Sequence, residues 1–343
     1  MLVRFLRALT PLRLAAAGLF VLALTFVVFL TRGSDEYLEI PDEAHPLAGL
    51  VSVQGGETQQ DGGGIYYVDV IIKRASFIET LIPALRPDGA DLIDRRQVVI
   101  PGISDRERLK LQLADMRLSQ VIASAVALRA LGYEVPVRLG GVRIVSVTSD
   151  SHAVGLLKED DVIVSAEGKP VRRREDLQAI LAGHRVGDVV RIGIRRGGKR
   201  RTLRIRTTND EREPRRPIIG VLPAQALKVS FPFRIRFNLG EVGGPSAGLA
   251  FALELLEKRG RDVDKGYKVA ATGEIQLDGT VTRIGGVKQK TIGARQADVD
   301  VFLVPVDGDN ARMARRYAKG LRIIPVESFQ QALRALATLP RKD

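Results

Sequence analysis

Ser246 lies in the segment Gly244-Pro-Ser-Ala-Gly248, which matches G-x-S-x-G, a pattern that can place a nucleophilic serine on a sharp turn. In the hydrolase fold that uses this pattern, the catalytic histidine follows the serine in the chain. The last histidine of this chain is His184, so no histidine follows Ser246. If Ser246 is a nucleophile, a different kind of residue must take its proton.

A lysine can take that proton when it is buried beside the hydroxyl, because burial disfavours the charged ammonium and lowers the pKa of the amine. Lys290 is the candidate. In the helix expected from about residue 287 to 297, Lys290 shares one face with the apolar residues Val287, Ala294 and Ala297. The alternative is structural: Lys290 would lay its apolar stem along the protein and keep its amine in water.

The residues around Ser246 also suit acyl transfer. Pro245 is predicted to begin a helix that runs to Arg259, which places Ser246 at a helix N-terminus, where free N–H groups can hold an oxyanion. Gly243 and Gly244 leave the backbone open to a substrate chain, and the candidate oxyanion donors are the N–H groups from Gly243 to Ala247. The alternative is an ordinary serine N-cap between turn glycines.

Composition argues against several other chemistries. The absence of cysteine excludes a cysteine nucleophile, disulfides and thiolate metal sites. His45, His152 and His184 lie at no metal-ligand spacing, so we expect no metal and no cofactor. Residues 169–206 hold thirteen Lys or Arg against three acidic residues, a net charge of +10. No aromatic residue interleaves this basic stretch, so we predict a solvated face and no specific nucleic-acid partner.

Residues 14–31 form an uncharged, apolar run of about the length that spans a bilayer as a helix. Arg4, Arg7 and Arg13 precede it. The positive-inside rule therefore predicts residues 1–13 in the cytoplasm and a single-pass protein of the cell membrane, with its C-terminal domains extracytoplasmic. The alternative is a cleaved signal peptide, but the run exceeds the usual apolar region and no A-x-A-like site follows it.

The pattern of apolar, polar and turn-forming residues divides the rest of the chain into segments. A strand is expected at residues 65–73 and a long helix at 106–131. The predicted segments are a stalk or linker at 32–64, a region with a strand and a long helix at 65–135, a strand-rich region at 137–208, a linker at 209–217, and alternating strands and helices at 218–343.

Two stretches of the last segment resemble the proteolytic domain of the Lon protease family. GGPSAGLAFALELL resembles the family's nucleophile segment, and ATGEIQLDGTVTRIGGVKQKTIGARQADVDVFLVP resembles the segment with its catalytic lysine. The resemblance implies a catalytic dyad of Ser246 and Lys290, with Thr272 nearby. Many members carry an acidic residue three positions before the serine, where this chain has Gly243. The chain contains no G-x-x-x-x-G-K-[ST] nucleotide site, so we expect activity without ATP.

The middle region resembles a bacterial PDZ domain over residues 151–171, with Asp160 where that pattern has glycine. PDZ domains bind extended peptide C-termini by strand addition. The nearest candidate for the loop that would hold the peptide carboxylate is Arg138 to Val142.

Together these observations predict an α+β fold. A Lon-type proteolytic domain, with an inserted PDZ-like β-rich domain, would follow one transmembrane helix. The resemblance implies that residues 65–135 form the first part of this protease domain and residues 218–343 its catalytic part. The predicted function is a membrane-anchored, ATP-independent serine endopeptidase that cleaves extended or unfolded extracytoplasmic proteins. Its expected partners are polypeptide substrates, a peptide C-terminus at the PDZ-like domain, the membrane through residues 14–31 and, because Lon-type domains tend to form rings, further copies of itself. The alternative function is a non-catalytic PDZ scaffold or substrate adaptor with an inactive Lon-like domain; a basic surface-binding protein ranks third.

Overall fold

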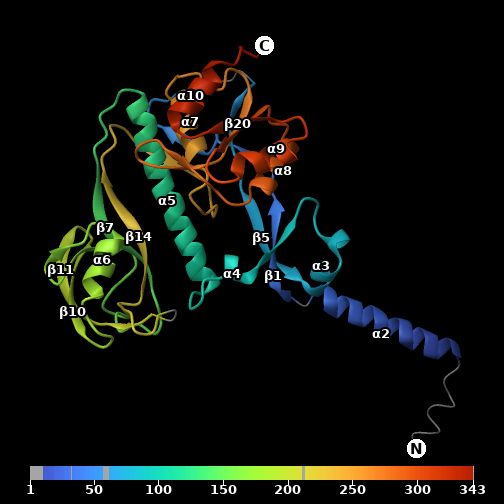
Figure 1. The fold of residues 1–343 in the computed structure, drawn as a ribbon, viewed down its shortest axis with the longest axis horizontal. Helices are drawn as coiled ribbons and strands as arrows, with labels where there is room; N and C mark the ends of the chain where they lie inside the picture. Colours follow the sequence, from blue (N-terminus) through green and yellow to red (C-terminus); the bar gives the residue numbers. More distant parts are fainter. Residues whose placement is uncertain (1–10, 32, 57–61, 211–212, 343) are drawn as a thin grey trace, which may run out of the picture. The chain divides into compact units, whose positions relative to one another are not determined.

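The computed structural model describes residues 11–31, 33–56, 62–210 and 213–342 (Figure 1). These residues form two compact units, Met1–Pro41 with Val70–Val98, and Asp42–Asp69 with Val99–Asp343. The predicted cytoplasmic segment 1–13 lies outside the described residues as far as residue 10.

The first unit contains a three-stranded antiparallel sheet in the order β5-β1-β6. Its elements are α2 (Pro11–Thr31), β1 (Gly33–Pro41), β5 (Val70–Ser76), α3 (Phe77–Leu81), the 3-10 helix η1 (Pro83–Leu85), β6 (Asp91–Asp94) and α4 (Arg95–Val98). The side chains of Ser76 and Glu79 form a reciprocal capping box that begins α3. Across the described part of the chain, no helix combines the length and the hydropathy that crossing a membrane needs.

The structure divides two predicted segments differently. The segment 32–64, predicted as a stalk or linker, contains β1 and two further strands, and its residues Leu47 and Val51 are buried in the main core. Residues 70–98, predicted as protease domain, belong to the first unit. Acidic and Gly-rich composition suggested a linker, but composition does not report the strand pairing that decides the structure.

The second unit is built around a five-stranded sheet in the order β2-β4-β16-β19-β20, in which the last four strands are parallel. Successive residues of a strand face opposite sides, so Val301 and Leu303 of β19 point into one hydrophobic cluster and Phe302 and Val304 into another. The first cluster is shared with α5, α7 and α10, and the second with α8 and α9. These elements are β2 (His45–Pro46), β4 (Gly64–Tyr67), α7 (Gly248–Glu257), β16 (Lys268–Ala271), α8 (Val287–Gln296), β19 (Val301–Pro305), α9 (Asn310–Tyr317), β20 (Arg322–Val326) and α10 (Phe329–Ala337). Two short antiparallel pairs complete this part, β3 (Val51–Val53) with β15 (Ile235–Phe237) and β17 (Glu274–Ile275) with β18 (Val281–Thr282).

A second sheet with its own core lies in the same unit, in the order β11-β10-β8-β7-β14, and β9 pairs with β8. Its elements are β7 (Val137–Val147), β8 (Val162–Ala166), β9 (Lys169–Pro170), α6 (Arg174–Leu181), β10 (Val189–Arg196), β11 (Lys199–Arg206) and β14 (Val221–Val229), with the small pair β12 (Thr208–Asn209) and β13 (Pro217–Ile218) between them. β14 pairs with β7 from Val221↔Val147 to Val229↔Val137. The strand-rich region therefore extends beyond residue 208, across the predicted linker 209–217, of which residues 211–212 lie outside the described set.

Helix α5 (Asp105–Ala130) packs on both sheets (Figure 1). Ser104 caps its N-terminus in a capping box with Glu107. Ala114 lies in a small cluster with β7 and β14, whereas Met116 and Ala123 lie in the main core beside α7. One rigid helix therefore joins the second sheet to the element that follows Ser246.

Candidate active site

Ser246 lies two residues before α7, which begins at Gly248, rather than within its first turn as the sequence predicted. The carbonyl oxygen of Ser246 accepts a hydrogen bond of 2.8 Å from the amide of Gly273, so this carbonyl serves a tertiary contact and not the helix. A Cβ at Gly248 would lie 2.8 Å from both Ile275 and the hydroxyl of Ser119, so only glycine lets α7 start so close to them. Ser246 is thereby held on a tight turn.

Lys290 reaches Ser246 from α8. This helix starts at Val287 after Gly286, whose φ of +69° suits glycine. Lys290 is 3% exposed, and its Nζ donates a 2.8 Å hydrogen bond to Ser246 Oγ. A buried amine within hydrogen-bond distance of a serine hydroxyl is the geometry of a nucleophile and its general base.

Thr272 supports the main chain of Ser246 and not its hydroxyl. Thr272 is fully buried, and its Oγ1 donates a 3.2 Å hydrogen bond to the carbonyl oxygen of Ser246. Its own amide donates to the carbonyl of Leu303 on β19, at 3.0 Å. The turn that carries the nucleophile is therefore tied to the central sheet.

The glycines before Ser246 contact α5. The amide of Gly244 donates a 2.8 Å hydrogen bond to the carbonyl of Gln112, so it is not available as an oxyanion donor, contrary to the sequence prediction. A Cβ at Gly243 would lie 2.7 Å from the Cβ of Gln112. In the described part of the chain, the amides of Gly243, Ser246 and Ala247 have no hydrogen-bond acceptor, which leaves them as the candidate oxyanion donors.

Sequence reasoning missed two contacts that α5 makes with the Ser246 turn. One is the Gln112 carbonyl, and in the other the buried Ser119 donates through Oγ to the carbonyl of Pro245 at 3.0 Å. For Ser119 the sequence offered a signal, because a polar residue on the apolar face of a helix requires a hydrogen-bond partner. The Gln112 contact is made by the main chain and leaves no such signal.

Family models match two parts of the chain. The model of the Lon protease (S16) C-terminal proteolytic domain matches residues 240–338, which include Ser246 and Lys290. The PDZ domain model matches residues 129–207. The chain carries a Lon-type proteolytic domain and a PDZ domain.

The curated relatives include Lon proteases, and each of these alignments covers only part of this chain. The Lon protease of Chloroflexus aggregans is 36% identical over 100 residues, 28% of this chain and 12% of that protein. The Lon protease of Clostridium beijerinckii is 40% identical over 103 residues, 29% of this chain and 13% of that protein. A solved PDZ domain of an SdrC-like protein from Listeria innocua is 28% identical, covers 25% of this chain and 97% of that chain, and superposes with a TM-score of 0.24. The matches to the Lon-type domain support a serine peptidase.

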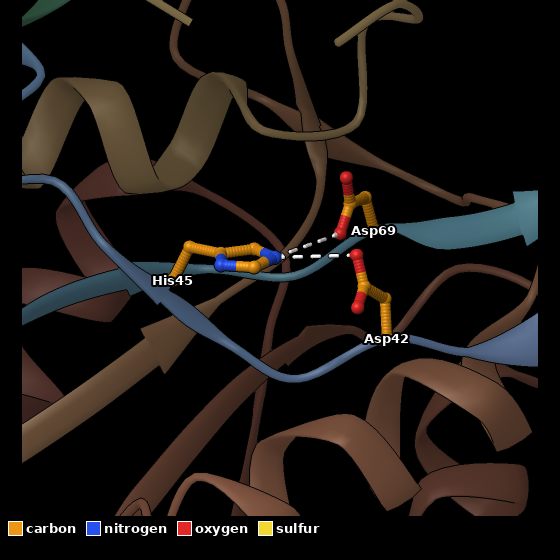
Figure 2. A group of neighbouring side chains, drawn as sticks. All are labelled: Asp42, His45 and Asp69. Atoms are coloured by element: carbon orange, nitrogen blue, oxygen red, sulfur yellow. Dashed lines mark hydrogen bonds and ion pairs between the residues drawn. The ribbon is translucent and has the colours of Figure 1, made fainter.

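Two groups of side chains other than the Ser246–Lys290 pair bring carboxylates together. Glu257, Asp262 and Asp264 offer ligand atoms within 4.8 Å of one another, the donor type that suits a hard cation. The second group, Asp42, His45 and Asp69, is equally close (Figure 2). In that group His45 Nε2 points at both carboxylates, and the charge of Lys290 lowers the pKa of Asp69, which burial raises.

The PDZ domain has a pocket of about 390 Å³ between α6 and the start of β14. Its walls include Leu177 and Leu181 of α6 and the turn from Ile218 to Val221. β14 is the edge strand of its sheet, so its outer edge can pair with an added strand. In this part of the structure the amides of Ile219 and Gly220 donate to no acceptor and could hold a carboxylate.

This placement corrects the predicted carboxylate loop. Arg138 to Val142 lies within β7 and pairs with β14 along its length, so it forms no open loop. The turn at Ile218 to Val221 was not considered in the sequence analysis because the edge strand β14 follows, rather than precedes, the rest of the PDZ sheet in the chain.

Proposed function

We propose that this chain is a membrane-anchored serine endopeptidase that uses Ser246 and Lys290 without ATP and cleaves extended or unfolded extracytoplasmic polypeptides. The observation that carries the proposal is the 2.8 Å contact between Lys290 Nζ and Ser246 Oγ, made by two segments that are far apart in the sequence. Lys290 is almost completely buried, and burial favours the neutral amine that a base requires.

The proposed cycle follows from this geometry. Neutral Lys290 takes the proton of Ser246, whose oxygen attacks a peptide carbonyl. The amides of Ser246 and Ala247 stabilise the oxyanion, and protonated Lys290 then gives its proton to the leaving amine. Water, activated by Lys290, hydrolyses the acyl-enzyme.

The test compares casein cleavage by the full chain and by variants, without nucleotide. Ser246→Ala and Lys290→Ala should abolish cleavage, and so should Lys290→Arg, because a guanidinium stays protonated. Lys288→Ala is the matched control and should leave cleavage unchanged. Lys288 belongs to the same helix as Lys290, but its Nζ is directed at Tyr317, 5.5 Å from the ring centroid, and not at Ser246. Cleavage that survives in both Ser246→Ala and Lys290→Ala would exclude the dyad.

We also propose that the PDZ domain is inserted in the Lon-type domain and captures substrate C-termini. Packing supports the insertion: β4 pairs with β16, and α5 packs beside α7, although the PDZ domain lies between these segments in the chain. Ile100 to Ile103, just before α5, line the peptide pocket, and α5 contacts the Ser246 turn through Gln112. A peptide bound in the pocket could therefore alter the position of the dyad through α5.

Fluorescence anisotropy tests peptide capture. A labelled peptide with an apolar C-terminal residue should bind, and the same peptide with an amidated C-terminus should bind at least about tenfold more weakly, because it lacks the charged hydrogen-bond acceptor. Equal binding of the two peptides would argue against a carboxylate site at Ile219 and Gly220.

The proposal of membrane anchoring through residues 14–31 rests on the uncharged, apolar sequence of that run, although no helix among the described residues meets the length and hydropathy that a membrane span needs. Protease added to intact cells should degrade the C-terminal domains while the protein stays with the membrane fraction after a salt wash. Release of the full chain by salt would contradict the anchor.

A further inference from the structure

Three charged or titratable side chains form a cluster that the dyad mechanism does not use (Figure 2). His45 Nε2 lies 3.2 Å from Asp42 Oδ2 and 3.8 Å from Asp69 Oδ1. The ring of His45 also packs against Tyr67, with 5.3 Å between ring centroids. The histidine therefore fixes two carboxylates relative to each other.

This cluster is attached to the helix that carries Lys290. The amide of Ala44 donates a 3.2 Å hydrogen bond to the carbonyl of Gly293, three residues after Lys290. A Cβ at Gly293 would overlap the carbonyl oxygen of Asp42, so glycine is needed for this close approach.

The neighbours of the cluster pack on the Lys290 face of α8. Ala44 and Val68 are buried in one hydrophobic cluster with Val287 and Ala294. These two α8 residues lie three positions before and four positions after Lys290, so they share its face. The segments that carry Asp42 and Asp69 and the Lys290 face of α8 thus contribute to the same hydrophobic cluster.

The charge of Asp69 is felt at Lys290. Asp69 Oδ1 is buried, and it has no hydrogen-bond partner among the described residues. Burial, and then the charge of Asp42, raise the pKa of Asp69, whereas the charges of His45 and Lys290 lower it. Coulomb interactions are mutual, so an ionised Asp69 stabilises the ammonium form of Lys290 to the same extent.

We propose that Asp69 is a positioning residue for Lys290, and that Asp42 and His45 hold Asp69 in place. The inference rests on the proposed Ser–Lys mechanism. Each acylation turns Lys290 into a buried ammonium, which is costly without an opposite charge. Asp69 stabilises this ammonium and keeps the amine directed at Ser246 until it delivers its proton, as the third group of a catalytic triad orients its base.

The titration of Lys290 measures this pairing directly. Lysine labelled with ¹³C at Cε is followed by NMR across pH in the full chain, with the Lys290 signal assigned from the Lys290→Ala variant. In Asp69→Asn the Lys290 midpoint should fall by about 1 pH unit, because an opposite charge nearby is removed. Asp69→Glu keeps the negative charge, so the Lys290 midpoint should lie close to its wild-type value. The matched control is Asp298→Asn, which removes an exposed carboxylate after the end of α8 at a φ of +51° that asparagine tolerates.

Several other titratable side chains also face Asp69. Asp42 and His45 face it from the segment around β2, Tyr67 from β4 and Lys290 from α8. Burial, followed by the charges of Asp69 and Asp42, raises the pKa of Tyr67 to about 12, so its phenol stays neutral through the measured range.

Casein cleavage gives the second readout. The acidic limb of the kcat/KM profile in Asp69→Asn should move in the same direction as the Lys290 midpoint, and kcat should fall about tenfold with little change in KM, because the loss affects proton transfer and not substrate binding. An unchanged Lys290 midpoint in Asp69→Asn overturns the proposal. A shifted midpoint in a chain whose casein cleavage does not depend on Ser246 would support the pairing and refute the proposed function, so the two failures can be told apart.

Discussion

The buried carboxyl of Glu254, on the helix α7 that follows the nucleophile, predicts how the stability of this helix depends on pH. It is 2% exposed, and its Oε1, 3.4 Å from Lys258 Nζ, has no hydrogen-bond partner among the described residues. Burial is the largest influence and raises the pKa of Glu254 from 4.5 to about 7, although the charge of Lys258 opposes it. The folded protein therefore binds this proton more tightly than the unfolded chain does.

The sign of the pH effect follows from this difference. The stability that protonated Glu254 contributes is fully present below the unfolded pKa of 4.5 and is lost as pH rises through the folded pKa of about 7. At 1.36 kcal/mol for each pKa unit, this rise corresponds to about 3 kcal/mol. Glu254→Gln is neutral at every pH and should not lose this stability.

Hydrogen exchange of the α7 amides, residues 248–257, is the assay, because it reports local stability in a chain with more than one compact unit. Exchange in wild type relative to Glu254→Gln should speed up by about a hundredfold between pH 5 and pH 8, the equivalent of about 3 kcal/mol. Comparison at equal pH cancels the intrinsic exchange rate. Glu134→Gln, which removes an exposed carboxyl, should match wild type at both pH values.

A constant ratio of wild-type to Glu254→Gln exchange across this range would refute the reasoning. It would mean that Lys258 fully compensates the buried carboxylate, so that its pKa is ordinary.

Two further substitutions test contacts described above. Gly243→Ala would place a Cβ 2.7 Å from the Cβ of Gln112. In casein cleavage kcat/KM should fall at least about tenfold, and in denaturation the free energy of unfolding should fall by about 1–3 kcal/mol. Wild-type activity in this variant would show that α5 can move to accommodate the extra methyl group. Asp161→Asn breaks the paired hydrogen bonds of 2.7 and 2.6 Å from Arg196 and should destabilise the PDZ sheet by about 3–5 kcal/mol in hydrogen exchange of β8, whereas the neighbouring Asp160→Asn should be nearly neutral.

The dyad residues could be proposed from sequence because each has a strong local signal. Ser246 lies between small turn residues, and Lys290 interrupts an apolar helix face that the spacing of Val287 and Ala294 defines. Both patterns consist of residues that are close in the sequence to Ser246 or to Lys290. The start of α7 could not be predicted, because the carbonyl of Ser246 is taken by Gly273, which lies 27 positions later in the chain.

The contacts that position the site are non-local and leave little trace in the sequence. Nothing in the sequence around Asp69 places it beside α8, since that proximity depends on the pairing of β4 with β16. β14 carries Pro223 and Gln225 and lies in the chain next to the catalytic segment, so nothing in its residues indicated that it completes the PDZ sheet. Long-range strand pairing decided both outcomes.

The bond from the Gly244 amide to the Gln112 carbonyl joins main chain to main chain. Almost any helix-forming residue at position 112 would keep it, because the side chain takes no part. Position 112 could therefore vary freely among related proteins while the contact itself persists, and a search for functional residues by conservation would pass over it. In this chain the constraint lies across the interface, at Gly243, where a Cβ would lie 2.7 Å from the Cβ of Gln112.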